Sequence, residues 1–131
     1  MNREFLTYYK EFEDSFIRFK ETANNSKTEY EKDIVVQRFQ FTVALFIEVL
    51  KQLLNKNNVS CVYPSDCIKK AAHFGLIPAE QIFLEMLEDR YEIINLKSRI
   101  PEKLYQRIKI KYVIALGIFI EKIQTNYIMK R

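Results

Sequence analysis

The residues of this chain that are best suited to chemistry lie between positions 89 and 99. Asp89 and Arg90 are adjacent, Asn95 follows five residues after Arg90, and Lys97 and Arg99 add two further cations. A guanidinium can hold a phosphate through two parallel hydrogen bonds, and such a contact strengthens in a cleft of low dielectric. Asp89, Arg90, Asn95, Lys97 and Arg99 are therefore candidate residues for holding a phosphate.

Arg90 also has a purely structural interpretation. In helical spacing, with steps of four, three and four residues, it falls on the apolar stripe Phe83, Leu87, Arg90 and Ile94. A cation in that position can belong to a partly buried ion pair beside Asp89, with its long stem lying over apolar neighbours. The helical period alone favours this structural interpretation.

Other catalytic chemistry finds little support in the sequence. The two glycines are isolated, so they cannot form a glycine-rich loop that cradles a phosphate. A catalytic triad or dyad would need His73, the only histidine, which lies near a predicted helix C-terminus where surface histidines are common. The carboxylates Glu85, Glu88 and Asp89 have helical spacing but lack the Glu-x-x-His motifs of di-iron bundles. We expect neither a metal nor a cofactor.

The two cysteines and the apolar runs bear on the location of the protein. Cys61 and Cys67 have five residues between them, and no second pair of cysteines or histidines completes a zinc set. Two reduced thiols are expected. The N-terminus MNREFLTYYK lacks the apolar core of a signal peptide, and the apolar run over 113–120 is far shorter than a membrane span. These features predict a cytoplasmic protein that does not enter a membrane.

The composition is typical of an all-α protein. The 131 residues include only two glycines and three prolines, which leaves few turn formers for an all-β fold. Hydrophobic residues make up 48% and charged residues 29%, so the chain is not disordered. A net charge of +4, spread along the chain, is compatible with an anionic partner but is not the footprint of a dedicated DNA binder. We expect residues 1–131 to form a single domain.

Hydrophobic periodicity predicts two long helices in the first half of the chain. Residues 2–24 carry an apolar seam of Phe5, Tyr9, Phe12, Phe16 and Phe19. The second helix runs to about residue 55 and begins at a capping box formed by Ser26 or Thr28. It is apolar over more than half of its circumference, which predicts burial on several sides, in a bundle centre or at a subunit interface.

The three prolines mark the starts of the remaining helices. Pro64 opens a short helix that ends at Gly75, Pro78 opens a helix over 78–99, and Pro101 opens the last helix. The last helix, about 101–128, carries its own apolar seam of Tyr105, Ile108, Tyr112, Ala115, Phe119 and Ile123. Four long helices and one short helix joined by short loops predict an up-and-down antiparallel four-helix bundle.

Four stretches together resemble one protein family. They are IVVQRFQFTVALFIEVLKQLL at 34–54, YPSDCIKKAAHFGLI at 63–77, IFLEMLEDR at 82–90 and IPEKLYQRI at 100–108. Their order and spacing are similar to those of the nucleotidyltransferase substrate-binding proteins of the HEPN superfamily. This resemblance implies a four-helix bundle that forms a homodimer. It also implies a partner, a minimal nucleotidyltransferase encoded beside it in a toxin–antitoxin-like system.

The resemblance also bears on the stretch from 89 to 97. In the family this helix typically reads EDRNxxxHxY, and its Arg and His form the RNA-cleaving motif of toxin members at a cleft between two protomers. The Tyr can be modified with AMP by the nucleotidyltransferase. In this chain Asp89 and Arg90 match the motif, but Tyr91, Asn95 and Lys97 stand at the Asn, His and Tyr positions. Asn95 cannot shuttle a proton and Lys97 offers no phenol.

Three functions follow from these observations. The first is a non-catalytic partner subunit of a nucleotidyltransferase that binds nucleotide or RNA at a dimer cleft around Arg90. The second is a metal-independent ribonuclease toxin with an altered motif, in which His73 or Tyr91 replaces the missing acid–base residue. The third is a purely structural helical interaction module in which Arg90 belongs to an ion pair. The resemblance favours the first.

Overall fold

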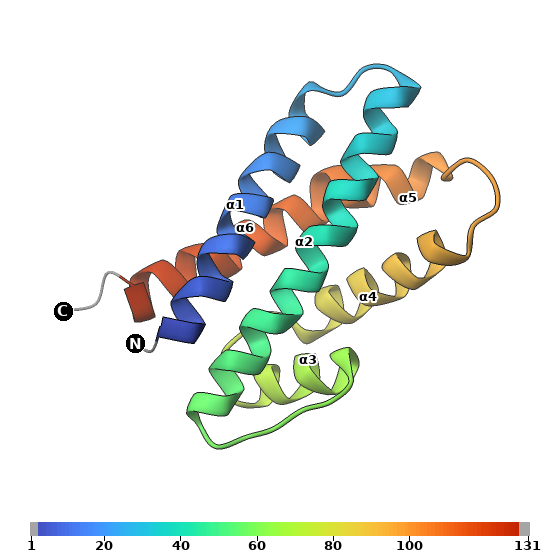
Figure 1. Cartoon of the computed structure of the whole chain (residues 1–131). Helices are drawn as coiled ribbons and strands as arrows, with labels where there is room; N and C mark the ends of the chain where they lie inside the picture. Colours follow the sequence, from blue (N-terminus) through green and yellow to red (C-terminus); the bar gives the residue numbers. More distant parts are fainter. Residues whose placement is uncertain (1–2, 129–131) are drawn as a thin grey trace.

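The computed structural model describes residues 3–128, and the regular structure in that range is entirely helical (Figure 1). The elements are α1 (Arg3–Asn25), α2 (Glu29–Lys56), α3 (Pro64–His73), α4 (Glu80–Asn95), α5 (Glu102–Gln106), the π-helical η1 (Arg107–Tyr112), α6 (Val113–Ile123) and the π-helical η2 (Gln124–Ile128). The last four follow one another without a break and form one long C-terminal helix. The prediction of an all-α protein with four long helices and one short helix is confirmed.

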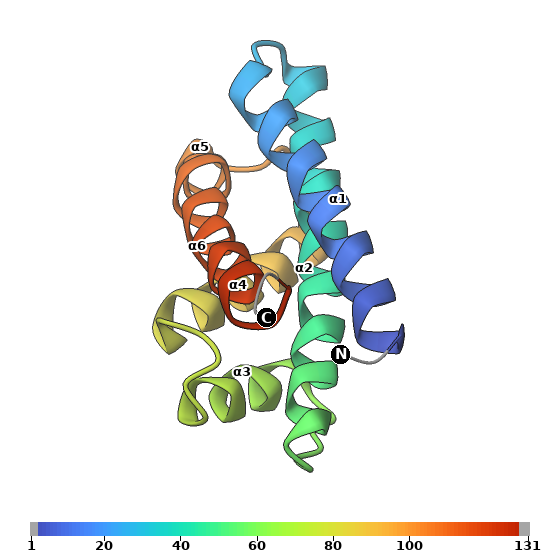
Figure 2. The ribbon, with the colours of Figure 1, turned by 90° about the vertical axis from the view of Figure 1, so that its left-hand side faces the viewer.

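The helices form two layers. In the first, α1 and α2 make an antiparallel hairpin (Figure 1). The second contains the C-terminal helix, which crosses this hairpin obliquely, and the pair α3 and α4 (Figure 2). Among the described residues, no helix combines the length and the apolar character that crossing a bilayer would require.

Phenylalanine side chains at the centre of the core join both layers. The ring of Phe12 on α1 lies 6.0 Å from that of Phe46 on α2 and 5.9 Å from that of Phe119 on α6. Phe46 in turn stacks on Phe83 of α4 at 5.0 Å. Four helices therefore meet around these rings, and offset and edge-on aromatic contacts of this kind add to the free energy gained by burial.

Both predicted apolar seams lie in this core. The seam of α1 is buried over its whole length, at Phe5, Tyr9, Phe12, Phe16 and Phe19. The seam of the C-terminal helix is buried as well, at Tyr105, Ile108, Tyr112, Ala115, Phe119 and Ile123. The second helix contributes eleven buried residues to the core, while Phe41 on α2 is 64% exposed.

Local hydrogen bonds explain where α2 begins. The Glu31 amide donates to the Thr28 hydroxyl at 3.1 Å, and the Thr28 amide donates to the Glu31 carboxylate at 2.9 Å. This is the predicted capping box, formed at Thr28 and not at Ser26. Hydrogen bonds from the Thr28 and Lys27 amides lower the pKa of the Glu31 carboxyl. The Ser26 hydroxyl instead bonds to the hydroxyl of Tyr105.

The prolines mark helix starts less exactly than predicted. Pro64 is the first residue of α3, and Gly75 follows that helix with a φ of +71°, as expected of a C-terminal cap. Pro78, however, precedes α4, because Ala79 is extended and acts as the N-cap, so the helix begins at Glu80. Pro101 is likewise the N-cap of α5 and not its first residue.

The structure corrects the prediction of two reduced thiols. Cys61 and Cys67 form a disulfide bond, with their Cα atoms 5.3 Å apart. The connector before α3 turns at Tyr63 and Pro64, which brings Cys61 beside the first turn of the helix, within the range that a disulfide requires. Spacing alone does not reveal this turn.

Candidate functional site

The face that α4 buries places Asp89 in the interior. Phe83, Met86 and Leu87 are buried, with Phe83 stacked on Phe46 of α2, and Asp89 is 5% exposed and bonded to the C-terminal helix. It is the only buried ionisable side chain among residues 3–128 whose group is charged at neutral pH. Such a charge is costly unless other groups compensate it.

The C-terminal helix supplies that compensation. The guanidinium of Arg107 donates two hydrogen bonds of 2.9 Å to Asp89, from Nε to Oδ2 and from Nη2 to Oδ1. The hydroxyl of Tyr112 donates a third bond to Oδ2. The bidentate bond to Asp89 raises the pKa of Arg107, whereas burial, followed by the bond to Asp89, raises the pKa of Tyr112. We call these three side chains the Asp89 cluster.

The π-helical segment η1 explains how two residues of one helix reach the same carboxylate. Arg107 and Tyr112 are five residues apart, and in a regular α-helix they would point about 140° away from each other. A π-helical turn is closed by i→i+5 hydrogen bonds, so residues five apart lie on the same side. The segment spans Arg107–Tyr112, and both side chains therefore face α4.

A second ion pair between α4 and the C-terminal helix lies nearer the surface. The ammonium of Lys111 is 2.6 Å from the carboxylate of Glu85, one turn before Asp89. The Tyr112 hydroxyl also lies 3.3 Å from Glu85. Both charged side chains are more than a third exposed, so this pair contributes less to stability than the buried one.

Arg90 is a predicted site residue with a buried donor that no other described residue satisfies. Its side chain is partly buried, and its Nε, like that of Arg38 on α2, is fully buried without a hydrogen-bond partner among residues 3–128. No ion pair joins it to another residue in the range 3–128, because Asp89, its neighbour in sequence, pairs with Arg107 instead. The interpretation of Arg90 as an ion-pair member is therefore not what this structure shows.

The remaining predicted site residues lie on the surface and do not bond to Asp89. Asn95 is exposed, and its amide donates to the carbonyl of Tyr91 at 2.9 Å. Because Leu96 is extended and ends α4, Lys97 and Arg99 lie in an exposed loop and not in the helix predicted over 78–99. Ile94 is 57% exposed, so the predicted apolar stripe ends at Arg90. Within one copy of the chain, the five predicted residues do not converge on one point.

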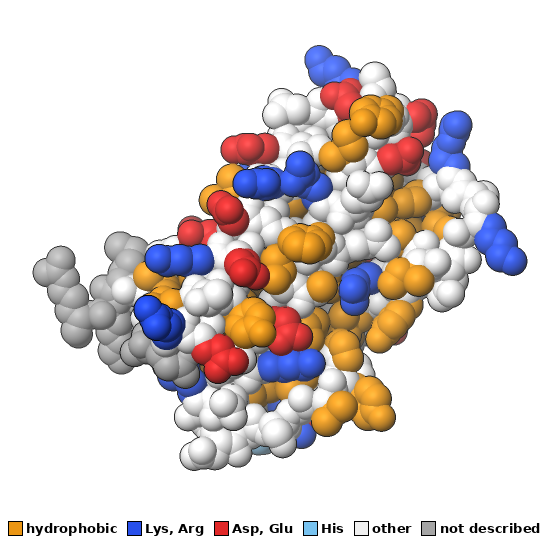
Figure 3. Space-filling model, viewed as in Figure 1, with side chains coloured by type: hydrophobic (Ala, Val, Ile, Leu, Met, Phe, Trp, Pro, Cys, Tyr) orange, Lys and Arg blue, Asp and Glu red, His pale blue; other side chains and the backbone are white. Residues whose placement is uncertain are grey.

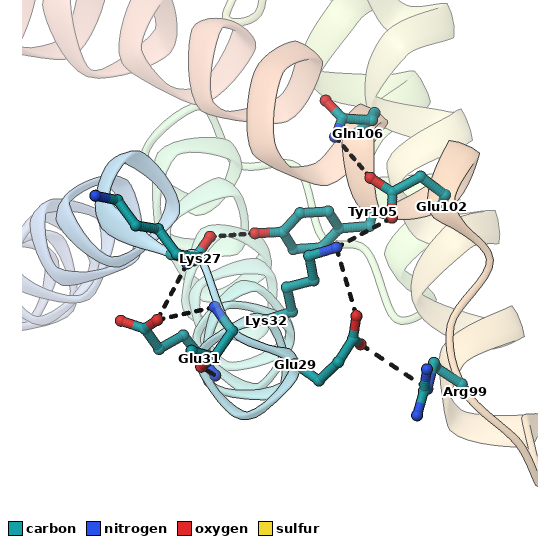
Figure 4. A network of polar contacts seen from close by, with 10 residues as sticks. Lys27, Glu29, Glu31, Lys32, Arg99, Glu102, Tyr105 and Gln106 are labelled. Atoms are coloured by element: carbon teal, nitrogen blue, oxygen red, sulfur yellow. Dashed lines mark hydrogen bonds and ion pairs between the residues drawn. The ribbon is translucent and has the colours of Figure 1, made fainter.

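Arg99 reaches a different part of the surface. It is 78% exposed and lies 3.8 Å from Glu29 at the start of α2, beside a cavity of about 240 Å³ (Figure 4). Lys32 lies 3.3 Å from Glu102 and 5.1 Å from the centre of the Tyr105 ring. A hydrogen bond from Gln106, followed by that from Lys32, lowers the pKa of the Glu102 carboxyl. This network ties the start of α2 to the start of the C-terminal helix.

Other candidate chemistry is not assembled here. His73 is exposed at the end of α3, with its ring against that of Phe74 at 5.3 Å. In the part of the chain that the structure describes, no three His, Cys, Asp or Glu side chains gather as they would to hold a metal ion. On the face shown in Figure 3, acidic and basic side chains are interspersed, with hydrophobic ones exposed between them.

A comparison with family models decides the classification. The model described as "Nucleotidyltransferase substrate binding protein like" matches residues 7–125. The chain belongs to this family. No curated protein matches it. In this nucleotidyltransferase substrate-binding-like protein the match covers α1 through α6, and so includes Arg90 and the whole Asp89 cluster.

The sequence pointed to Asp89 and Arg90 but missed Arg107 and Tyr112. These two residues lie 18 and 23 positions after Asp89, on another helix. The helical period places Tyr112 on the apolar seam, and Arg107 is one of several basic residues in the opening turns of the last helix, so neither residue stands out as a partner of Asp89. An acid on a buried face does signal that a buried donor is needed, but it does not say which residue provides it.

Proposed function

We propose that this protein is the partner subunit of a minimal nucleotidyltransferase in a two-component, toxin–antitoxin-like system. In this proposal two copies form a dimer that binds a nucleotide or RNA at a cleft around Arg90. Membership of the nucleotidyltransferase substrate-binding family supports the first part. The observation that carries the second is the buried, unpaired Nε of Arg90.

A phosphate would supply what Arg90 lacks. A buried donor without a partner is costly, and a charged donor more so, which makes such a group uncommon in native structures. Two phosphate oxygens could accept from the guanidinium of Arg90 in the bidentate manner typical of arginine. Arg107 and Tyr112 occupy the oxygens of Asp89, so that carboxylate does not compete for Arg90. The arrangement thus favours an anionic ligand.

The same geometry favours binding without catalysis. The side chain of Asn95 is held in a local bond to the carbonyl of Tyr91, and a carboxamide neither gains nor loses a proton near neutral pH. His73 is on α3, outside the helix that carries Arg90. We therefore expect the purified dimer to leave RNA uncut in EDTA, at the same level as an Arg90→Ala variant.

Co-purification tests the partnership directly. The protein would be expressed together with the small nucleotidyltransferase from a neighbouring reading frame, with an affinity tag on only one of the two. We expect both chains to elute together through size-exclusion chromatography. Separate elution, combined with ATP affinity no higher than that of Arg90→Ala, would overturn the proposed function.

A further inference from the structure

The outward face of the C-terminal helix carries a regular row of side chains. Ile110, Ile114 and Ile118 are 53%, 57% and 47% exposed, although isoleucine is usually buried. Arg107 precedes Ile110 by three residues, and Glu121 follows Ile118 by three. We call these five side chains the isoleucine row. In sequence they are spaced at steps of three, four, four and three, and Arg107, which reaches toward Asp89 of α4, lies at the edge of this face with its side chain 36% exposed.

This face has the character of a surface that another molecule covers. On the opposite side of the same helix, Tyr112, Leu116 and Phe119 are buried against the hairpin and α4. A helix that is apolar on both sides is typical of a position between two packed layers. No described element lies over the row, so it leaves three neighbouring isoleucines in water. Isolated exposed apolar residues are ordinary, but a contiguous row marks a contact surface.

The order of the row identifies the covering molecule. The steps read the same in both directions, and the charge at one end is opposite to that at the other. If a second copy of the helix runs antiparallel with Ile114 facing Ile114, then Ile110 faces Ile118 of that copy. Arg107 in turn faces Glu121 of the second copy, and the reverse pair forms as well. Such a self-complementary surface is what a twofold dimer requires.

The charges at the two ends are available for this contact. Glu121 is exposed, and no hydrogen bond or ion pair joins it to another residue of the range 3–128. The side chain of Arg107 remains 36% exposed, and its bonds to Asp89 use Nε and one N–H of Nη2. A guanidinium has five N–H donors, so Arg107 can serve Asp89 and a second carboxylate together.

We propose that two copies of this chain associate antiparallel through the isoleucine row. The proposal deepens the dimer part of the proposed function and rests on it only in requiring a second copy. Because Arg107 belongs both to the row and to the Asp89 cluster, this contact would adjoin the part of α4 that carries Arg90. The proposed dimer surface therefore lies on the last helix and not on the exposed face of α4.

Two substitutions of equally exposed isoleucines test the surface. Ile114→Glu places a charge at the centre of the row, and Ile94→Glu places the same charge on α4, where Ile94 is also 57% exposed. Analytical ultracentrifugation of the full chain would measure the dimer dissociation constant of each. We expect a dimeric wild type, a rise of at least tenfold for Ile114→Glu, which removes a central apolar contact, and little change for Ile94→Glu. Circular dichroism would confirm that both variants remain helical.

The end charges provide a second, milder test. Glu121→Lys should weaken the dimer and Glu11→Lys on α1 should not, because only Glu121 would face Arg107. If Ile114→Glu loses helix content, Ile118→Ser replaces it in the same measurement. A monomeric wild type, or an Ile114→Glu protein that dimerises as well as wild type, would overturn the proposal. A dimer lost only in Ile94→Glu would move the interface to α4, overturning this inference while leaving the Arg90 site intact. ATP binding by wild type and Arg90→Ala reports on that site separately.

Discussion

Asp89 on α4 and Arg107 on the C-terminal helix, 18 residues apart in sequence, are joined by two parallel hydrogen bonds of 2.9 Å. Asp89 is buried, and Tyr112 donates a third hydrogen bond to it. The carboxylate thus fixes α4 to the C-terminal helix at one buried point. It also leaves Arg90, the next residue of α4, without its nearest possible partner. The cation that pairs with Asp89 is therefore Arg107, and Arg90 is the separate cation that we propose for ligand binding.

The first prediction concerns the stability of this buried pair. Asp89→Asn should lower the free energy of unfolding by about 2 kcal/mol, because it removes the charged acceptor of Arg107 and Tyr112, while solvent around the 36% exposed Arg107 side chain screens part of the loss. The control is Glu85→Gln, one turn earlier, whose carboxylate pairs with Lys111 near the surface. That substitution should lower the free energy of unfolding by less than about 1 kcal/mol. Urea unfolding followed by circular dichroism measures both, and equal losses would contradict the role given to Asp89.

The second prediction concerns alkaline pH. Burial, with the hydrogen bond to Asp89, raises the pKa of Tyr112 above its ordinary value of about 10. Below pH 10 the phenol is neutral in both states and its contribution to stability is complete. Above pH 10 it ionises only in the unfolded chain, so the contribution is lost as the pH rises.

Replacing the phenol should remove this dependence. Above pH 10 the free energy of unfolding of wild type should fall more steeply than that of Tyr112→Phe, by up to about 1.4 kcal/mol per pH unit. Tyr9, whose pKa burial and Glu13 also raise, affects both proteins equally and so cancels in the comparison. Denaturant unfolding at a series of pH values measures the two slopes. Parallel slopes would show that Tyr112 titrates as it does in the unfolded chain.

The third prediction concerns the disulfide bond. Cys61 and Cys67 close a short loop before and within α3. On the chain-entropy account, a loop of this size stabilises the folded state by about 2 kcal/mol. Dithiothreitol should therefore lower the unfolding midpoint of wild type and leave that of Cys61→Ser unchanged. If the reductant shifts neither protein, or shifts both alike, the bond does not contribute as stated.

Much of the fold could be predicted from the sequence because it depends on local pattern. The apolar seams of α1 and the C-terminal helix follow the helical period, and a four-residue motif predicts the capping box at Thr28. Helix ends were less accurate where the deciding residue had no distinctive type. Ala79 and Leu96 are extended and so shorten α4 at both ends, but neither residue signals a boundary by itself.

The candidate site was harder to predict because its contacts are distant in sequence. The link between Asp89 and Arg107 depends on how two helices pack, and the shared approach of Arg107 and Tyr112 depends on a π-helical segment that has no sequence signature. The helical period did bring Arg90 to the edge of the core. It could not show that its neighbouring acid would be used by another residue.

The measurement that tests the central claim most directly is the affinity for ATP of wild type and of Arg90→Ala, by isothermal titration calorimetry. Arg18→Ala is the control, since Arg18 is an exposed arginine on α1 whose side chain is 63% exposed. We expect Arg90→Ala to bind at least about tenfold more weakly, which corresponds to the loss of one charged hydrogen-bonding group, with little loss of unfolding free energy. Arg18→Ala should bind as wild type does. Equal ATP affinity in wild type and Arg90→Ala would contradict the account, as would a large loss of stability with unchanged binding.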